Sequence, residues 1–397
     1  MNRHTDLIET SGQYSVLRQN LKMLTLALII LEGPVQSLIA DETQHGNESD
    51  WASFRHNPQL SGFTESNLPE DLAPRWVFHD ESGFEATVAI SGNNVYTGDM
   101  DGTLWALDLR SGRERWRFES DSEIKSSPLA SDGTIFFGNE SGLLHALDAA
   151  SGTKKWVFET DAGITSSPNV AGGCLLFGSY DNYLYCLDPE SGELRWRLET
   201  EGYVNATPAI WEQNAISAGC DGYLRVVRLS DGQEIKRISL GGYVGASSAV
   251  VGDFSVVGNF ESQILGIDLA KGELAWTYDN PERDFPFYAS AAVTQQLAVL
   301  GGRDKNVYAL HPKTGEIRWI YTTGDRIDSS PVIAGDRVFI ATQAGQLLAL
   351  NLETGSVVWN FDTGESMTAS LSVAAGYLII GTVDGTLFAF AEPVRKL

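Results

Sequence analysis

The chain has 397 residues, with 52 acidic against 28 basic side chains and a formal net charge of −24. Binding to nucleic acid or to anionic lipid requires a positive surface, so this balance argues against both partners. The three cysteines are too few for a disulfide-rich framework, and the six scattered histidines lack the spacing of a metal site. Composition therefore excludes several function classes without naming one.

The N-terminus resembles an export signal. An apolar run at residues 23–31 follows two positive charges, and plausible cleavage positions follow Ser37 and Ala40. The run is too short to span a bilayer comfortably. We therefore interpret residues 1–40 as an export signal and residues 41–72 as a lead-in segment. This predicts an exported protein of the periplasm or cell envelope with no membrane span after signal removal. An uncleaved anchor and a strand of the folded domain are the alternatives.

One sequence pattern recurs eight times along the rest of the chain at a spacing of about forty residues. A Trp stands four residues after a Gly in six copies, whereas one copy has Lys236 after Gly232. Repeats of this length that are rich in turns and strand-forming residues indicate a propeller or a solenoid. A large side chain at a fixed place in each copy is suited to joining one blade to the next. The tryptophans with this expected structural role are Trp76, Trp116, Trp156, Trp196, Trp276, Trp319 and Trp359.

Each repeat is predicted to form four strands. In the repeat from Lys125 to Thr160, β-branched, aromatic and aliphatic runs are bounded by Gly, Asp and Ser. Small residues open the first strand, as expected where strands crowd around a central axis, and Pro128 there requires a strand with a free edge. No amphipathic helix is predicted after residue 50. The four predicted strands of this repeat are 126–129, 133–138, 143–148 and 154–158.

The strand count predicts how the ring closes. Seven complete sets of strands end at Trp359, but the last set, from Ser366 to Phe390, has only three. The spare strand at residues 75–78 supplies the fourth and would remove two exposed edges. We therefore predict an all-β, eight-bladed β-propeller of four-stranded antiparallel blades over residues 73–391, closed by an N-terminal strand, with a tail at 392–397. An open solenoid is the alternative, but it gives that strand no role.

Two of the three cysteines lie at one predicted hairpin, and the third lies in another repeat. Cys174 and Cys186 flank one predicted hairpin and could face each other, but we interpret them as two buried reduced thiols. Cys220 is expected in a loop between strands as a lone thiol. The sequence therefore predicts three reduced cysteines and no metal site.

The differences between the copies point to one rim of the propeller. No catalytic arrangement of Ser, His and Asp and no phosphate-binding loop stands out. The loop that enters the innermost strand and the hairpin between strands two and three should share a rim, where blades three to six carry aromatic and charged residues. Clustered aromatic and Arg side chains are typical of interaction surfaces, although several of the aromatics could instead pack beneath their own loops. The candidate partner- or ligand-binding residues are Tyr180, Tyr203, Tyr243, Phe260, Phe285, Phe287, Tyr288, Arg303, Arg326 and Asp328.

The repeat unit from Gly98 to Trp116 resembles a known family. It reads Gly-x-x-Asp-Gly-x-Leu-x-Ala-Leu-Asp-x-x-Ser-Gly-x-x-x-Trp, which is similar to the pyrroloquinoline-quinone (PQQ) repeat. The segment 51–55, Trp-Ala-Ser-Phe-Arg, also resembles the lead-in of exported PQQ-like propellers. The resemblance covers nearly all of residues 73–391. It implies a relation to the quinoprotein dehydrogenases or to the non-enzymatic B subunit of the outer-membrane β-barrel assembly machinery.

The resemblance implies different sites for the two branches. The alcohol-oxidising quinoproteins typically stack the quinone against a disulfide between adjacent cysteines, and this chain has no adjacent Cys pair. Their calcium ligands also have no matching positions here. We therefore expect a non-catalytic scaffold that binds protein partners in the cell envelope, without a cofactor. A dehydrogenase that uses PQQ with calcium, and a sensor of a carbohydrate or another small ligand, are the alternatives.

Overall fold

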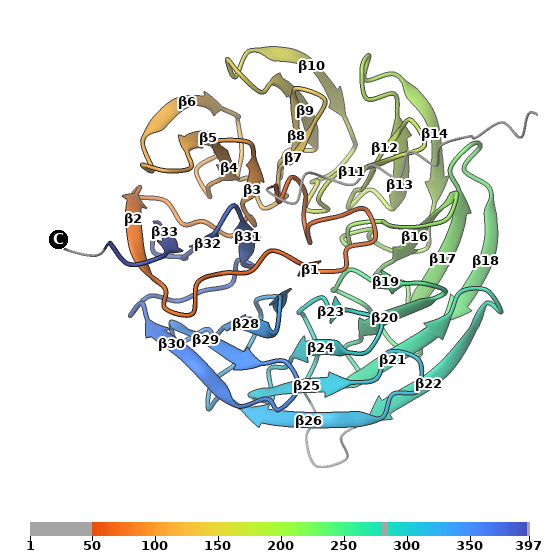
Figure 1. Cartoon of the computed structure of the whole chain (residues 1–397). Helices are drawn as coiled ribbons and strands as arrows, with labels where there is room; N and C mark the ends of the chain where they lie inside the picture. The colour runs from red at the N-terminus through yellow and green to blue at the C-terminus, as the bar shows by residue number, and fades with distance from the viewer. Residues whose placement is uncertain (1–49, 280–284, 395–397) are drawn as a thin grey trace, which may run out of the picture. The chain divides into compact units, whose positions relative to one another are not determined.

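The computed structural model describes residues 50–279 and 285–394, which form thirty-three β-strands and no helix. The strands make eight sheets arranged around one axis (Figure 1). The innermost strands of neighbouring blades are in contact, and β3 of the first blade also contacts β31 of the last. The predicted eight-bladed, all-β propeller is therefore confirmed. No helix within the described residues is long and apolar enough to cross a membrane. The proposed export signal at residues 1–40 lies outside the described part.

The blades, numbered 1 to 8 in chain order, share one order of strands from the axis outward. The innermost strands are β3 (Ala89–Ser91), β7 (Leu129–Ser131), β11 (Asn169–Ala171), β15 (Ala209–Trp211), β19 (Ala249–Val251), β23 (Ala292–Val293), β27 (Val332–Ala334) and β31 (Ser372–Ala374). The second strands are β4 (Asn94–Gly98), β8 (Thr134–Gly138), β12 (Cys174–Gly178), β16 (Asn214–Ala218), β20 (Phe254–Gly258), β24 (Ala298–Gly301), β28 (Arg337–Ala341) and β32 (Tyr377–Gly381). The third strands are β5 (Thr103–Asp108), β9 (Leu143–Asp148), β13 (Tyr183–Leu187), β17 (Tyr223–Arg228), β21 (Gln263–Asp268), β25 (Asn306–Leu310), β29 (Gln346–Asn351) and β33 (Thr386–Ala391). The outermost strands are β6 (Glu114–Glu119), β10 (Lys154–Glu159), β14 (Leu194–Glu199), β18 (Glu234–Ser239), β22 (Glu273–Asp279), β26 (Ile317–Thr322), β30 (Val357–Asp362) and the N-terminal β2 (Ala73–His79).

The N-terminal strand closes the ring. β2 pairs antiparallel with β33, with Trp76 opposite Ala389 and Phe78 opposite Leu387, and it becomes the outer strand of blade 8. The predicted closure is therefore confirmed. Because β33 already pairs with β32 on its other side, β2 covers the outer edge that the three C-terminal strands would leave exposed.

A recurring side-chain contact joins each outer strand to the next blade. Trp76 Nε1 donates a 2.8 Å hydrogen bond to the carbonyl of Leu109 in blade 1. Its ring lies directly against Gly112, which has φ +67°, so any side chain there would collide with the indole. This explains why a Gly precedes each Trp in the repeat. The other donors and their acceptor carbonyls are Trp116 with Ala149, Trp156 with Pro189, Trp196 with Leu229, Lys236 with Leu269, Trp276 with Pro312, Trp319 with Leu352 and Trp359 with Leu72.

The small residues near the axis form a series of hydrogen bonds from blade to blade rather than the start of a strand. In blade 2 the strand begins at Leu129, so the prediction that it opens at Ser126 was wrong. The backbone N–H of Ser127 instead donates to the hydroxyl of Ser167, 3.0 Å away in the next blade. A short hydroxyl side chain is needed here, because blades crowd together near the axis. The same bond joins Thr87 to Ser127, Ser167 to Thr207, Thr207 to Ser247, Ser247 to Ser290, Ser290 to Ser330, and Ser330 to Ser370.

The described part of the lead-in crosses the centre of the ring (Figure 1). It runs past the inner edges of the first strands of successive blades, whose backbone N–H groups would otherwise lack acceptors. Its last residues form β1 (Phe63–Thr64), which pairs parallel with β27. The acceptor carbonyls of the lead-in and the N–H groups that donate to them are Trp51 with Ile90, Ala52 with Ala130, Pro58 with Ile210, Gln59 with Val250, Ser61 with Val293, and Gly62 with Ile333.

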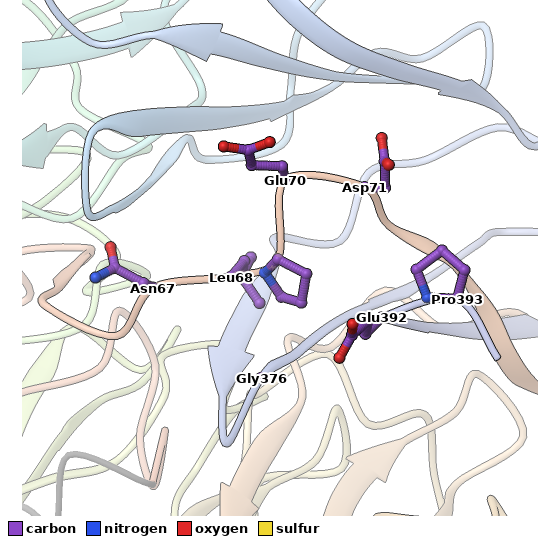
Figure 2. Close-up of a pocket in the computed structure, with 8 residues that line it drawn as sticks. Asn67, Leu68, Glu70, Asp71, Gly376, Glu392 and Pro393 are labelled. Carbon is purple, nitrogen blue, oxygen red and sulfur yellow. The ribbon is translucent and has the colours of Figure 1, made fainter. Parts of the chain in front are cut away.

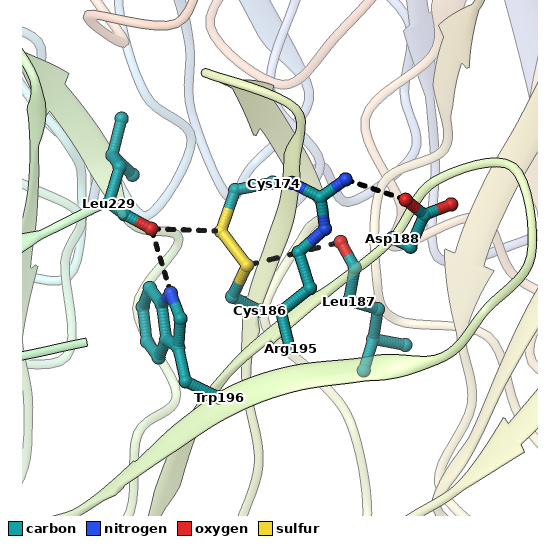
Figure 3. The surroundings of a disulfide bond; sticks show 7 residues. All are labelled: Cys174, Cys186, Leu187, Asp188, Arg195, Trp196 and Leu229. Atoms are coloured by element: carbon teal, nitrogen blue, oxygen red, sulfur yellow. Dashed lines mark hydrogen bonds and ion pairs between the residues drawn. A yellow bond between two sulfur atoms is a disulfide. The ribbon is translucent and has the colours of Figure 1, made fainter. Parts of the chain in front are cut away.

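Cys174 and Cys186 form a disulfide, so the interpretation as two reduced thiols was wrong. Cys174 lies on β12 and Cys186 on the adjacent β13, with their Cα atoms 5.3 Å apart. The pairing of Leu176 with Cys186 puts Cys174 diagonally across the hairpin on the same face. Both side chains are buried against Trp196 and blade 4, as Figure 3 shows. Cys220 has a free thiol, as predicted.

Candidate functional site

The two kinds of loop expected to share a rim do so. In blade 5, the hairpin between the second and third strands meets the loop that enters the first strand, and Phe260 N donates to Tyr243 O at 2.9 Å. The same bond recurs in blade 4, from Cys220 N to Tyr203 O at 3.1 Å. These backbone bonds fix the rim loops to one another. The aromatic side chains on this rim are therefore carried by loops with defined positions.

Two tyrosines of this rim, on blades 4 and 5, are exposed. Tyr203 is 54% exposed and Tyr243 is 62% exposed. The ring of Tyr180 packs against that of Tyr203, with the centroids 5.1 Å apart. Exposed aromatic rings on a well-ordered rim are costly in water unless a partner covers them, and this is a feature of interaction surfaces.

A second group on the rim surrounds Tyr288 of blade 6. The ring of Tyr288 lies 4.7 Å from that of Phe260, and the guanidinium of Arg303 stacks 3.6 Å from its centre. Arg303 also makes a bidentate ion pair with Asp328 of blade 7, with N–O distances of 2.7 and 3.0 Å. The hydrogen bonds that Arg303 donates to the carboxylate of Asp328 raise the pKa of Arg303 above its usual value. The group therefore joins three blades in a fixed arrangement.

The structure separates Phe287 from the other candidates. Its side chain is only 3% exposed and packs against Tyr308 in the core of blade 6, so it is not a rim residue. Its position in the repeat matches the buried residues Ile124 and Ile164. The three-residue insertion at residues 278–286, part of which lies outside the described residues, obscured this match. Phe285 and Arg326 are exposed, and the carbonyl of Arg326 accepts the hydrogen bond from Gln343 N that joins the same two kinds of loop in blade 7.

A charged cluster in blade 4 was missed by the sequence analysis. Arg225 is almost completely buried and pairs with Asp221 at 2.6 Å, with Glu234 at 2.9 Å and with Glu201. Arg237 pairs with Glu201 at 2.7 Å at the edge of the cluster. The signal was present, because Arg225 stands at a repeat position that is aromatic or aliphatic in the other copies. All its charges are paired internally, so we interpret it as a structural network.

His145 occupies the same repeat position in blade 2 as Arg225 in blade 4. Its ring is stacked on Phe137 with the centroids 4.9 Å apart, and both ring nitrogens are buried without a partner among the described residues. Burial lowers the pKa of His145 to about 4, a shift that the Asp121 carboxylate opposes and the nearby Lys154 reinforces. The folded state therefore holds the neutral imidazole, whereas the unfolded chain takes up a proton near the usual pKa.

This difference predicts acid sensitivity. The stability that neutral His145 contributes is complete above pH 6.5 and is lost as the pH falls toward 4, because the unfolded state then binds more protons. His145→Leu, which copies Leu265 and Leu348 at the same repeat position, should retain roughly 2 kcal/mol more of its stability across this range than the wild type. Urea unfolding at several pH values measures the difference. Parallel pH profiles of the two proteins would show that His145 is not responsible.

The clearest pocket in the described part lies away from the rim. It has a volume of about 780 Å³ and lies where the lead-in meets the end of the chain (Figure 2). The carboxylates of Glu70, Asp71 and Glu392 surround it. Gly376, which also lines it, is in the turn between β31 and β32, on the face opposite the candidate rim. The pocket and the rim are therefore separate features.

The residues do not fit the quinone and calcium pair of the alternative interpretation. The bonded cysteines are twelve residues apart and buried between blades 3 and 4, so they cannot form the adjacent pair on which a quinone stacks. Across residues 50–279 and 285–394, no three His, Cys, Asp or Glu side chains converge as ligands of a metal ion. Asp328, the acidic candidate of the rim, is already paired with Arg303.

The fold is shared with several solved structures. BamB from Moraxella catarrhalis is 18% identical with a TM-score of 0.70, covering 82% of this chain and 99% of that one. A quinohemoprotein alcohol dehydrogenase from Comamonas testosteroni is 14% identical with a TM-score of 0.74, covering 88% and 82%. A computationally designed protein, Ika8, is 19% identical with a TM-score of 0.70, covering 79% and 98%. At these identities the likeness shows the fold alone. No match was found among curated proteins.

The family is shown by the sequence itself. A family model described as outer membrane protein assembly factor BamB matches residues 65–179 and 142–392, which together span the whole propeller. The suspected PQQ-like repeat is thereby confirmed. The chain belongs to this family of PQQ-repeat propellers.

Proposed function

We propose that this protein is a non-catalytic, exported propeller that binds protein partners in the cell envelope through its aromatic rim. The observation that carries the proposal is the exposure of Tyr203 and Tyr243 beside a fixed group of Tyr288, Arg303 and Asp328. The family model that matches this chain is described as an outer membrane protein assembly factor. This description supports an envelope location and a protein partner.

The rim has the physical properties of an interface rather than of a reaction centre. Tyrosine presents a large contact area and loses little conformational entropy on binding, because it has few rotatable bonds. Arg303 is already held by Tyr288 and Asp328, so a partner would not have to order it. Tyr and Arg are also the residues most enriched at interface hot spots. The proposal of a non-catalytic role rests on the ion pair between Arg303 and Asp328, which occupies the acidic candidate of the rim.

Capture experiments on rim variants test this proposal. The double variant Tyr203→Ala/Tyr243→Ala and the charge reversals Arg303→Glu and Arg326→Glu are expected to reduce capture of envelope proteins at least tenfold, as loss of a hot spot would. Each protein is used as bait for solubilised envelope extract, and the captured proteins are quantified by mass spectrometry. Circular dichroism and the melting temperature would verify that each variant is folded.

Matched controls lie on other surfaces of the same propeller. Arg115 forms a 2.6 Å ion pair with Asp108 beside the turn between the third and fourth strands, on the opposite face. Ile320 is an exposed apolar residue of the outer strand β26. Arg115→Glu and Ile320→Ala should capture the same proteins as the wild type. If the rim variants and these controls capture equal amounts, the rim is not the interaction surface.

A spectroscopic experiment separates this function from its alternatives. The purified protein is incubated with PQQ and calcium, desalted, and then examined by absorbance and by a dye-linked activity assay. We expect neither retained quinone nor turnover. Retained quinone with turnover would refute the non-catalytic proposal and identify a dehydrogenase, whereas retained quinone without turnover would identify a cofactor-binding sensor.

A further inference from the structure

Three arginines of the described chain are almost completely buried, and they differ in what surrounds them. Arg225 is paired with three carboxylates. Arg337 donates to two main-chain carbonyls, those of Leu68 and Glu70. Arg55 is completely buried and donates to a single carbonyl, that of Ala291, through Nη2 at 2.9 Å. Its Nε and Nη1 atoms have no hydrogen-bond partner among the described residues. Arg55 is therefore the buried arginine whose hydrogen-bonding groups are the least satisfied of the three.

The lead-in holds the Arg55 side chain near the axis of the ring. The carbonyl of Arg55 accepts a 3.0 Å hydrogen bond from Gly62 N, which closes a loop in which Arg55 has φ +60°. The guanidinium lies against the Cα of Gly62, where any side chain would collide with it. Ala291 lies next to β23, an innermost strand of the ring. The loop thus extends the guanidinium to the innermost part of blade 6.

The energetic cost of this arrangement is unusual. Burial lowers the pKa of Arg55 to about 9, and no carboxylate of the described residues offsets this effect. The guanidinium therefore remains protonated at neutral pH, and two of its nitrogens have no acceptor within residues 50–279 and 285–394. A buried cation without a counter-charge costs several kcal/mol, and proteins normally pair it. Among the described residues, Arg225 is paired with carboxylates, and Arg337 has two carbonyl acceptors and the nearby carboxylates of Asp336 and Glu70. Arg55 has neither arrangement, which indicates that a counter-ion belongs to it.

A second polar group lies at the matching place in the next blade. Ser248 has the same repeat position in blade 5 as Ala291 in blade 6, and its hydroxyl is also buried without a partner in the described part of the chain. Like a guanidinium, a hydroxyl can donate a hydrogen bond to an anion. Trp51 Nε1, a donor on the same lead-in, is likewise buried without an acceptor among these residues.

We propose that Arg55 binds a small oxyanion, a carboxylate, sulfate or phosphate group, at the axis of the propeller beneath the lead-in. The planar guanidinium is suited to oxyanions, because its N–H groups match the spacing of their oxygen atoms. The anion supplies the missing counter-charge, and so it ties the lead-in to blade 6. This site is separate from the rim and does not depend on the function proposed for it.

The test measures the anion directly. The full-length protein, purified in HEPES buffer with sodium chloride, is desalted and denatured, and the released sulfate, phosphate and carboxylates are quantified by ion chromatography. We expect a stoichiometric amount of one oxyanion from the wild type and from Arg337→Met, a control for burial of an arginine, but none from Arg55→Met. A wild type that releases no oxyanion overturns the proposal, whether or not the variants fold.

A binding measurement distinguishes a true site from retained buffer components. Protein refolded from urea without oxyanions is titrated with sodium sulfate or sodium acetate while its melting temperature is recorded. A saturable rise in melting temperature is expected for the wild type and for Arg337→Met, because a ligand that binds only the folded state stabilises it. The rise should be absent in Arg55→Met. An equal rise in all three proteins would indicate a general salt effect and refute the site.

Discussion

Replacing Trp76 by Ala is expected to lower the free energy of unfolding by about 3–5 kcal/mol, the usual cost of removing a buried aromatic side chain. Trp76 is 8% exposed, and it bonds to Leu109 and covers Gly112. It lies on β2, the strand that closes the ring, so its loss also weakens the contact between the first and last blades. The midpoint of urea unfolding measures the change.

Two control variants separate the parts of this contact. Trp76→Phe keeps an aromatic ring over Gly112 but loses the hydrogen bond to Leu109. The lost hydrogen bond should lower the free energy of unfolding by about 1 kcal/mol, in addition to the effect of the smaller buried area. Val77→Ala alters an exposed neighbour on the same strand and should have little effect. A loss of less than 1 kcal/mol in Trp76→Ala, similar to that in Val77→Ala, would mean that this Trp is not essential to ring closure.

The fold was predictable because the same pattern of strands and turns occurs eight times in the sequence. The spacing of Gly and Trp, together with the spare strand at residues 75–78, was enough to predict the number of blades and the closure by β2. Comparing the copies makes the strand assignment more secure, since a strand with a weak pattern in one copy has a clear pattern in another. The start of the innermost strand was misjudged because Ser126 and Ser127 were assigned to the strand, although serine favours turns and here hydrogen-bonds to the neighbouring blade.

The candidate site was less predictable, because it depends on single residues. A residue can be assigned to the rim only if its copy of the repeat is aligned correctly with the other copies. The insertion before Phe287 shifted this alignment, so Phe287, a core residue, was assigned to the rim. The pairing of Arg303 with Asp328 joins residues of different blades, so no pattern within one copy indicates it. The path of the lead-in past Arg55 has no counterpart in the repeats and could be found only from the structure.

The disulfide was misjudged for a similar reason. Two cysteines on neighbouring strands bond only if the register brings their Cβ atoms together, and a shift of one residue would place them on opposite faces. The sequence does not give that register. In the structure, Leu176 rather than Cys174 lies opposite Cys186, and the bond spans the diagonal.

Reducing the disulfide is expected to lower the free energy of unfolding by about 3 kcal/mol, because the bond closes a loop of twelve residues and so restricts the unfolded chain. The wild type should unfold at a lower urea concentration when a phosphine reductant is present. Cys174→Ala/Cys186→Ala should be destabilised to at least the same extent and should not respond to the reductant. Cys220→Ala, which removes the free thiol, should respond as the wild type does.

The same measurement bears on where the protein folds. Structural disulfides persist in oxidising compartments and are rare in the cytosol, so a bond that stabilises the fold by this amount supports export to the envelope. Mass spectrometry after alkylation of the unreduced protein should show one free thiol, that of Cys220. Three alkylated cysteines, together with unfolding that the reductant leaves unchanged, would contradict the bond and would remove this support for the proposed location.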